Sequence, residues 1–191
     1  MKVYLNIVLL FLFLSQGLLA QFKCDTLKGR HSNYIYRKYN SKDGTGYNVF
    51  TVYAEGSKLD NADQGNFPMY PRPILFLRNM KVLSQLLKEN IKPYIKSEHI
   101  APGKNFRFNL YFNEKGEILE LYFTYRQELR IPIVAIENLD CGIKESCYIA
   151  ISGSKAIFEG ANFHRYVFAF PLEDIFNENL PEEDWKIRLW W

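Results

Sequence analysis

The chain has 191 residues, a length typical of one domain with at most a small appendage. Apolar residues make up 48% and charged residues 24%, which excludes a disordered, collagen-like or low-complexity protein. Basic residues exceed acidic ones by 24 − 21 = +3, a charge too small to indicate a nucleic-acid partner. The aromatic content of 16% is high and favours a β-rich domain.

The first twenty residues predict a secretory signal peptide. Lys2 supplies a positive charge, and residues 7–14 form an apolar run shorter than the roughly 20 residues that a membrane span needs. We expect cleavage after Ala20, with Gly17 as the second candidate. The competing interpretation is an uncleaved membrane anchor. The sequence thus predicts an exported protein, periplasmic, outer-membrane-associated or secreted, with no transmembrane span after removal of the leader.

Three cysteines follow the leader, at Cys24, Cys141 and Cys147, and an odd number allows at most one disulfide within a monomer. An oxidising compartment favours a bridge from Cys24 to one of the other two. Three unpaired, buried thiols are the alternative. No C-x-x-C spacing supports redox catalysis or structural zinc.

The first half of the mature chain predicts a hairpin, a loop and a helix. Residues 33–39 and 47–54 are aromatic and β-branched and flank a polar segment with two glycines, as in a β-hairpin. Residues 56–73 are rich in Gly, Asn, Asp and Pro and indicate a loop. Pro73 suits the first turn of a helix that Pro93 ends. The helix has an apolar stripe formed by Phe76, Met80, Leu83, Leu87 and Ile91.

Alternating apolar and polar residues predict a second hairpin, over residues 106–112 and 117–125. Gly116 provides the positive φ of its tight turn. The apolar face of the first strand includes Phe108, and its polar side is expected to hold Arg107, Asn109 and Tyr111.

A second helix, a second pair of strands and a tail complete the chain. Pro132 begins the helix, and Gly142 predicts its end nearby. Its apolar stripe consists of Ile133, Ile136, Leu139 and Ile143, and its solvated face of Glu137, Asp140 and Glu145. Residues 148–151 and 165–171 predict a strand pair. The tail is expected to dock on the domain through Trp185, Trp190 and Trp191.

This order of elements predicts an α+β fold: an antiparallel sheet with two helices packed on one face, preceded by an N-terminal β-hairpin. We divide the chain into a signal peptide (1–20), a hairpin with a Pro-rich loop (21–72), an α+β domain (73–172) and a C-terminal tail (173–191).

No group of residues predicts a catalytic or metal site. His31, His99 and His164 lack a second ligand at a spacing that would place two ligands on one face, and the adjacent Glu98 and His99 point apart in regular structure. Residues 152–155 (SGSK) lack the flanking glycines of a phosphate loop or nucleophile elbow and predict a turn. We therefore expect no catalytic residue, metal or cofactor.

Residues 75–172 resemble the TonB C-terminal domain. The resemblance is carried by the helix FLRNMKVLSQLLKENIKP, the strand–turn–strand FRFNLYFNEKGEILEL, the helical IPIVAIENLDCGIKES and the closing strand RYVFAFPL. The order Pro93-Tyr94 reverses the family's Tyr-Pro, and no long Pro/Lys-rich spacer follows the N-terminus. The chain is therefore more similar to stand-alone, exported proteins of Gram-negative bacteria with a TonB-like fold than to energy transducers.

The resemblance implies a non-enzymatic envelope or secreted protein that captures a peptide or protein partner by strand addition. On the resemblance, the candidate edge is Arg165, Tyr166, Val167 and Phe168. The alternative is a carbohydrate-binding module or small hydrolase that uses an aromatic surface on the first hairpin, formed by Tyr34, Tyr36, Tyr39, Tyr47 and Tyr53. The hydrolase would need a pocket that gathers acids such as Glu159 around His164. A third reading is a homodimer through free sheet edges or an intermolecular disulfide.

Overall fold

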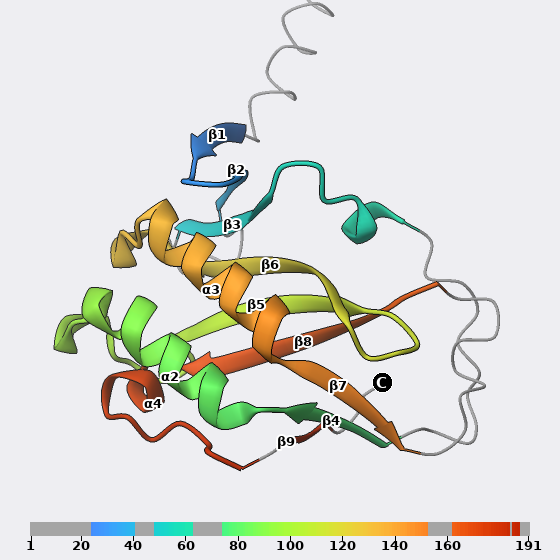
Figure 1. The fold of residues 1–191 in the computed structure, drawn as a ribbon. Helices are drawn as coiled ribbons and strands as arrows, with labels where there is room; N and C mark the ends of the chain where they lie inside the picture. The colour runs from blue at the N-terminus through green and yellow to red at the C-terminus, as the bar shows by residue number, and fades with distance from the viewer. Residues whose placement is uncertain (1–23, 41–47, 63–73, 153–161, 184, 188–191) are drawn as a thin grey trace, which may run out of the picture.

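A computed structural model describes residues 24–40, 48–62, 74–152, 162–183 and 185–187 (Figure 1). The fold is α+β, and all its strand pairs are antiparallel. The strands are β1 (Cys24–Lys28), β2 (Asn33–Asn40), β3 (Asn48–Ala54), β4 (Ile74–Arg78), β5 (Asn105–Phe112), β6 (Ile118–Arg126), β7 (Tyr148–Ser152), β8 (His164–Pro171) and β9 (Trp185–Ile187). The α-helices are α2 (Met80–Asn90), α3 (Ile133–Ser146) and α4 (Leu172–Phe176). Short 3-10 turns are η1 (Leu59–Asn61), η2 (Lys92–Tyr94), η3 (Ser97–His99) and η4 (Gln127–Leu129).

Six strands form the larger sheet, in the order β1-β2-β3-β6-β5-β8. Both predicted hairpins are confirmed, because β2 pairs with β3 and β5 pairs with β6. The first hairpin shares this sheet with the later strands, since β3 pairs directly with β6. The linker predicted at residues 41–46 lies outside the described residues.

The remaining strands form a second sheet, in the order β7-β4-β9. The predicted pairing of residues 148–151 with 165–171 is therefore wrong, because β7 pairs with β4 while β8 pairs with β5. The β5–β6 turn joins the two sheets: the Ile149 N–H donates to the Gly116 carbonyl at 2.8 Å. Gly116 has a φ of 81°, and a Cβ there would lie 1.8 Å from the Ile149 carbonyl oxygen, so this contact requires glycine.

The helix predicted from Pro73 begins later than expected. Residues 74–78 form β4, in which Leu75 and Leu77 are buried and Ile74 is exposed. Asn79 then adopts a left-handed conformation with a φ of 64°, which asparagine tolerates better than most residues and which separates the strand from α2. The apolar run ILFLR satisfies both a helical and a strand period, and only tertiary pairing decides between them.

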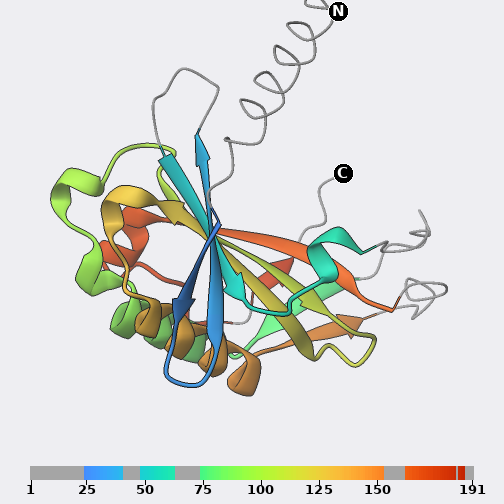
Figure 2. The ribbon, with the colours of Figure 1, turned by 90° about the horizontal axis from the view of Figure 1, so that it is seen from above.

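Helices α2 and α3 lie on the same side of the six-stranded sheet, as Figures 1 and 2 show. The helix predicted to end near Gly142 continues to Ser146. A Cβ on Gly142 would lie 2.7 Å from a methyl carbon of Leu86, so this glycine serves the close approach of the two helices rather than a helix end.

The core fills the space between the helices and this inner face of the sheet. Phenylalanines from three strands are essentially inaccessible there: Phe106, Phe108, Phe112, Phe123 and Phe170. The helices contribute buried aliphatic side chains, which include Leu83, Leu87, Ile136 and Leu139. The third helix, α4, was not predicted, and it buries Leu172 and Ile175 against the same core.

The two ends of the chain are described only in part. The predicted signal peptide lies outside the described residues, as do Trp190 and Trp191. No helix in the described part of the chain is long and apolar enough to cross a membrane. In the tail, Leu180 is buried and β9 pairs with β4.

Candidate functional site

The outer face of the six-stranded sheet, opposite the helices, carries a second apolar cluster. Its members are Tyr53, Tyr111, Tyr122 and Phe163, and none is more than 4% exposed. The prediction that Tyr111 lies on a polar side is therefore wrong, since this side chain is 0% exposed. The alternation of residues along the strand correctly placed Tyr111 on the same face as Arg107 and Asn109, but it could not show that another segment covers part of this face.

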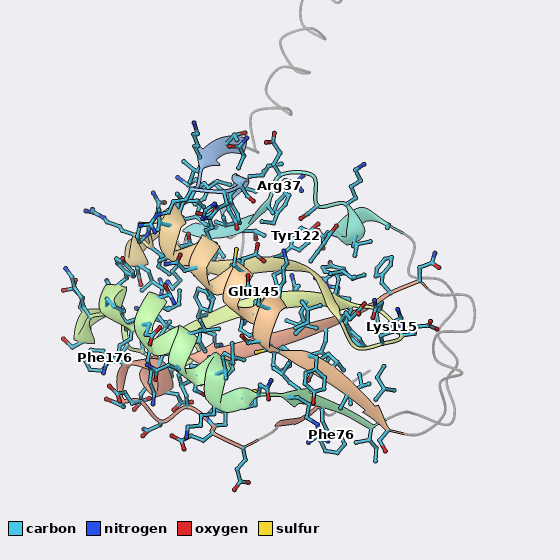
Figure 3. All side chains as sticks on the ribbon, viewed as in Figure 1. Arg37, Phe76, Lys115, Tyr122, Glu145 and Phe176 are labelled. Atoms are coloured by element: carbon cyan, nitrogen blue, oxygen red, sulfur yellow. The ribbon has the colours of Figure 1, made fainter. Side chains whose placement is uncertain are left out.

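The three tyrosines of this cluster lie in a row across the sheet, between two arginines. The ring centroids of Tyr53 and Tyr122 are 4.6 Å apart, and those of Tyr122 and Tyr111 are 5.3 Å apart. The Arg37 guanidinium lies 5.1 Å from the Tyr53 ring, and that of Arg165 lies 5.9 Å from the Tyr111 ring. We call Tyr53, Tyr122 and Tyr111 the tyrosine ladder; Arg37 and Tyr122 are labelled in Figure 3. An arginine thus makes a cation–π contact with the tyrosine at each end of the tyrosine ladder.

The segment around η1 covers one end of the outer face, and Glu120 on β6 holds it there. The Glu120 carboxylate accepts hydrogen bonds from the backbone N–H groups of Lys58 and Leu59, each at 3.0 Å. It also accepts the Tyr122 hydroxyl at 3.1 Å. One carboxylate therefore ties the covering segment to the tyrosine ladder.

Asp60 makes a parallel connection to β5 and β8. Its carboxylate accepts the Tyr111 hydroxyl at 2.7 Å and lies 3.6 Å from the Arg165 guanidinium. Burial and the hydrogen bond to Asp60 raise the pKa of Tyr111, although Arg165 acts in the opposite direction. Burial is also the main cause of the raised pKa of Tyr122. Both phenols are therefore neutral donors at physiological pH, which suits a structural hydrogen bond better than proton abstraction.

Strand β8 is the last strand of the six-stranded sheet, and within the described residues it pairs only with β5. The Leu172 N–H donates to the Lys104 carbonyl at 3.0 Å, which continues the β5–β8 register. Bonded pairs alternate in an antiparallel ladder, so residues spaced by two from Leu172 also bond to β5: Phe170, Phe168 and Tyr166. The residues between them turn their N–H and C=O groups away from β5: Arg165, Val167 and Ala169. We call these three the outward positions.

The side chains of the predicted edge divide in the same way. Phe168 is buried in the core and Tyr166 is half-buried. Arg165, Val167 and Ala169 are exposed on the outer face, and Val167, at 48%, is the most exposed large apolar side chain described. Pro171 falls at the next outward position, where its missing N–H removes no bond to β5.

The tyrosines proposed for an aromatic binding surface do not form one as far as the structure describes them. Tyr34 is 1% exposed and Tyr53 is 3% exposed, and they lie on opposite faces of the sheet. Tyr36 is half-buried against Phe50, with ring centroids 4.0 Å apart. The side chain of Tyr39 and all of Tyr47 lie outside the described part of the chain. A tyrosine-rich strand cannot show from its sequence which rings a helix or loop will cover.

The prediction that Glu137 and Asp140 lie on a solvated face of α3 is wrong, because Glu137 is 2% and Asp140 4% exposed. The Glu137 carboxylate accepts the backbone N–H groups of the β1–β2 turn, from Arg30 at 2.6 Å, His31 at 2.8 Å and Ser32 at 2.9 Å. Burial alone would raise the pKa of Glu137, but these hydrogen bonds lower it below its usual value.

Asp140 extends this attachment of the first hairpin to α3. It accepts the Tyr34 hydroxyl at 3.0 Å and forms an ion pair with Lys144 at 2.8 Å. A Cβ on Gly29 would lie 2.7 Å from a Glu137 oxygen, so the turn needs glycine to receive the carboxylate. Both acids therefore serve the fold, and Glu145 alone of the three is exposed.

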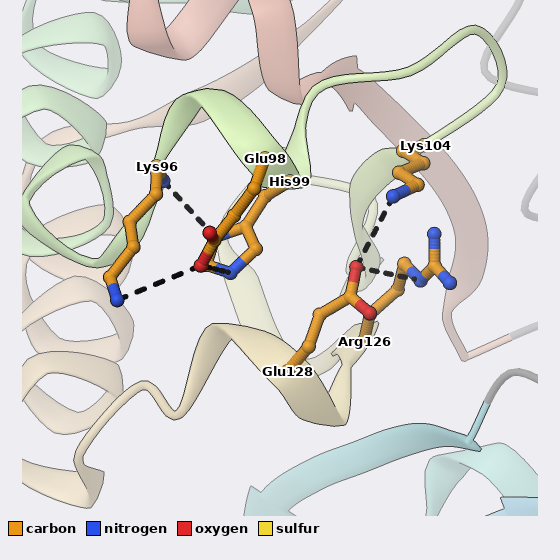
Figure 4. A network of polar contacts seen from close by, with 6 residues as sticks. All are labelled: Lys96, Glu98, His99, Lys104, Arg126 and Glu128. Carbon is orange, nitrogen blue, oxygen red and sulfur yellow. Dashed lines mark hydrogen bonds and ion pairs between the residues drawn. The ribbon is translucent and has the colours of Figure 1, made fainter.

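A charged network lies at the end of the sheet where β5 begins and β6 ends (Figure 4). Glu128 lies 3.3 Å from the Arg126 guanidinium and 3.4 Å from the Lys104 ammonium. Beside it, the Lys96 N–H donates to His99 at 3.0 Å. Glu98 and His99 do not point apart, because the 3-10 turn places their side chains 3.7 Å from each other. In the described part of the chain, each of these charged side chains is therefore paired with another member of the network.

The other predicted ligands are dispersed. His164 is 2% exposed beside the Phe112 ring, and His31 is exposed in the β1–β2 turn. Ser152 ends β7, while the rest of the SGSK motif and Glu159 fall outside the described residues. No three His, Cys, Asp or Glu residues form a metal-binding group in the part of the chain that the structure describes.

Cys141 and Cys147 are free thiols. Burial raises the pKa of Cys147 to about 11, so this thiol is un-ionised at physiological pH and poorly nucleophilic. The side chain of Cys24 is outside the described set.

Comparisons with known proteins bear on the fold. No protein-family model matches the chain, and no curated protein is similar to it in sequence. Among solved structures, the chain is similar to a DUF5043 family protein from Bacteroides uniformis ATCC 8492, with a TM-score of 0.50 and 12% sequence identity. The match covers 78% of this chain and 91% of that protein. At this identity the likeness shows a shared α+β fold and nothing of function.

Proposed function

We propose that this chain is an exported binding protein that captures an extended peptide or protein segment by strand addition at β8. The observation that carries the proposal is the row of outward backbone groups at Arg165, Val167 and Ala169, on a strand that pairs with β5 along one edge and with no described strand along the other. The hydrophobic leader supports export, and the resemblance to the TonB C-terminal domain supports peptide capture.

The composition of β8 agrees with a binding edge. Proteins commonly protect a free edge with lysines, an internal proline, a bulge or a very short strand. Strand β8 pairs with β5 over eight residues without a register shift, its one charge is Arg165, and its proline is the last residue. Such an edge can offer three N–H and three C=O groups to an added strand, and main-chain hydrogen bonds of this kind give affinity.

A library of phage-displayed linear dodecapeptides, selected on the purified protein, provides the test. We expect a selected peptide to slow amide hydrogen exchange at the outward positions. Val167→Lys should abolish this binding and Val167→Thr should retain it, while both variants keep the thermal midpoint of the parent. Val167→Pro removes an outward N–H and gives a second blocking variant. Selected peptides that leave these amides unprotected, or that bind Val167→Lys equally well, would refute strand addition at β8.

A further inference from the structure

The outer face beside β8 contains an arginine without a partner in the described structure, and it lies next to the proposed edge. Building on the proposed strand addition, we propose that the captured segment carries an aspartate or glutamate opposite Ala169, bound by Arg107, and an apolar residue opposite Val167. The ligand class is therefore an extended peptide in which an acidic and an apolar side chain are two residues apart.

Arg107 projects from β5 on the outer face and is exposed. Its neighbours across the sheet are Thr124 on β6 and Ala169 on β8. Among the described residues, no hydrogen bond or ion pair engages its guanidinium. The second arginine near this edge differs, because Arg165 is already held by the Asp60 carboxylate and lies over the Tyr111 ring.

Ala169 leaves the path from Arg107 to an added strand open. Directly opposed residues of an antiparallel pair point to the same face, so Arg107, Ala169 and the ligand residue opposite Ala169 share the outer face. The added strand would lie about 10 Å from β5, which is two strand spacings. A methyl group is the only side chain between them, and a long arginine and a carboxylate can meet above it. The planar guanidinium also suits bidentate binding of a carboxylate.

Val167 defines the second position of the ligand, the one expected to carry an apolar side chain. Its side chain is 48% exposed on the same face, and Asn109 is its neighbour on β5. An apolar ligand residue opposite Val167 would cover this surface. Side chains two residues apart in a strand share a face, which fixes the spacing between the acidic and the apolar position.

A second copy of the chain fits this edge less well. An antiparallel β8–β8 pairing centred on Val167 would place Arg165 of the other copy opposite Ala169. Arg107 would then meet a positive charge rather than a carboxylate. Charge complementarity therefore favours an acidic peptide over a homodimer at β8.

The selection described above tests this inference when it is run in parallel on the parent protein, Arg107→Gln and Lys81→Gln. Lys81 is exposed on α2, so its substitution removes the same charge on the helix side. We expect the parent and Lys81→Gln to enrich Asp or Glu two residues from Val, Ile, Leu or Phe. Arg107→Gln should lose the acidic preference and retain the apolar one.

A synthetic peptide from the selection and its Asp→Asn or Glu→Gln analogue then measure the contact. An exposed ion pair predicts about 3- to 5-fold weaker binding of the analogue to the parent, and equal binding of both peptides to Arg107→Gln. The difference should shrink at high salt. Peptides that protect the outward amides without any acidic preference, or with one that persists in Arg107→Gln, would overturn this inference and leave strand addition standing. Failure of every peptide to protect those amides would overturn both.

Discussion

The two faces of the six-stranded sheet come from the same strands but are built differently. The inner face is phenylalanine-rich and is covered by α2 and α3. The outer face carries the tyrosine ladder and exposed arginines, and the segment around η1 covers only the end held by Asp60 and Glu120. A period of two determines which residues share a face, whereas the covering segment determines whether that face becomes core or surface.

The uncovered part of the outer face lies beside β8, where Arg107, Val167 and Ala169 are exposed. A ligand could reach a helix-covered face only after displacement of the helices, whereas these side chains are already exposed. The inner face therefore stabilises the fold, and the outer face is where we propose that recognition occurs; substitutions can test that division.

The largest loss of stability is expected from a substitution on the inner face. Phe108→Ala removes a ring that is 0% exposed and should lower the free energy of unfolding by about 3–5 kcal/mol, measured by urea denaturation. Val167→Ala, on the paired strand but the outer face, should change it by less than about 0.5 kcal/mol. Similar losses for the two variants would contradict the division.

A substitution of Glu137 tests the hydrogen bonds that attach the β1–β2 turn to α3. Glu137→Gln should cost about 1–3 kcal/mol, because a neutral amide cannot accept all three N–H groups as the carboxylate does. Glu145→Gln, on the exposed side of α3, is the matched control and should be near neutral. An equal effect of the two substitutions would show that the β1–β2 turn does not depend on Glu137.

The stability difference between the parent protein and Glu137→Gln should depend on pH, in a direction that the pKa of Glu137 determines. The pKa of Glu137 is lower in the folded state than in the unfolded chain, so its stabilisation is complete above the unfolded pKa of about 4.3. It is lost as the pH falls through the folded pKa. The stability difference between the parent and Glu137→Gln should therefore be constant near neutrality and shrink on acidification below pH of about 4. A difference that grows there would contradict this assignment.

A smaller loss of stability is expected from a substitution in the tyrosine ladder. Tyr111→Phe keeps the ring and removes the hydroxyl that donates to Asp60, which should cost about 1 kcal/mol. Tyr148→Phe, at a side chain 47% exposed, should be silent in the same denaturation experiment. A silent Tyr111→Phe would mean that the hydrogen bond to Asp60 does not hold the covering segment.

The sequence predicted the elements whose signals are local. The β5–β6 hairpin follows from strict alternation and a turn glycine, and α3 from a proline and a helical stripe. Strand β4 was missed because ILFLR fits two periods and its partners, β7 and β9, are distant in sequence. The burial of Glu137 was missed for the same reason, since its donors lie more than 100 residues away. The β8 edge was anticipated only by resemblance, and its outward positions required the register with β5.

Amide hydrogen exchange of the free protein tests the central claim most directly, because it needs no ligand. In β8, the amides of Tyr166, Phe168 and Phe170 should be protected by their bonds to β5, and those of Arg165, Val167 and Ala169 should exchange much faster. Uniform protection along the strand would show that the edge is already occupied, and would contradict a binding site there.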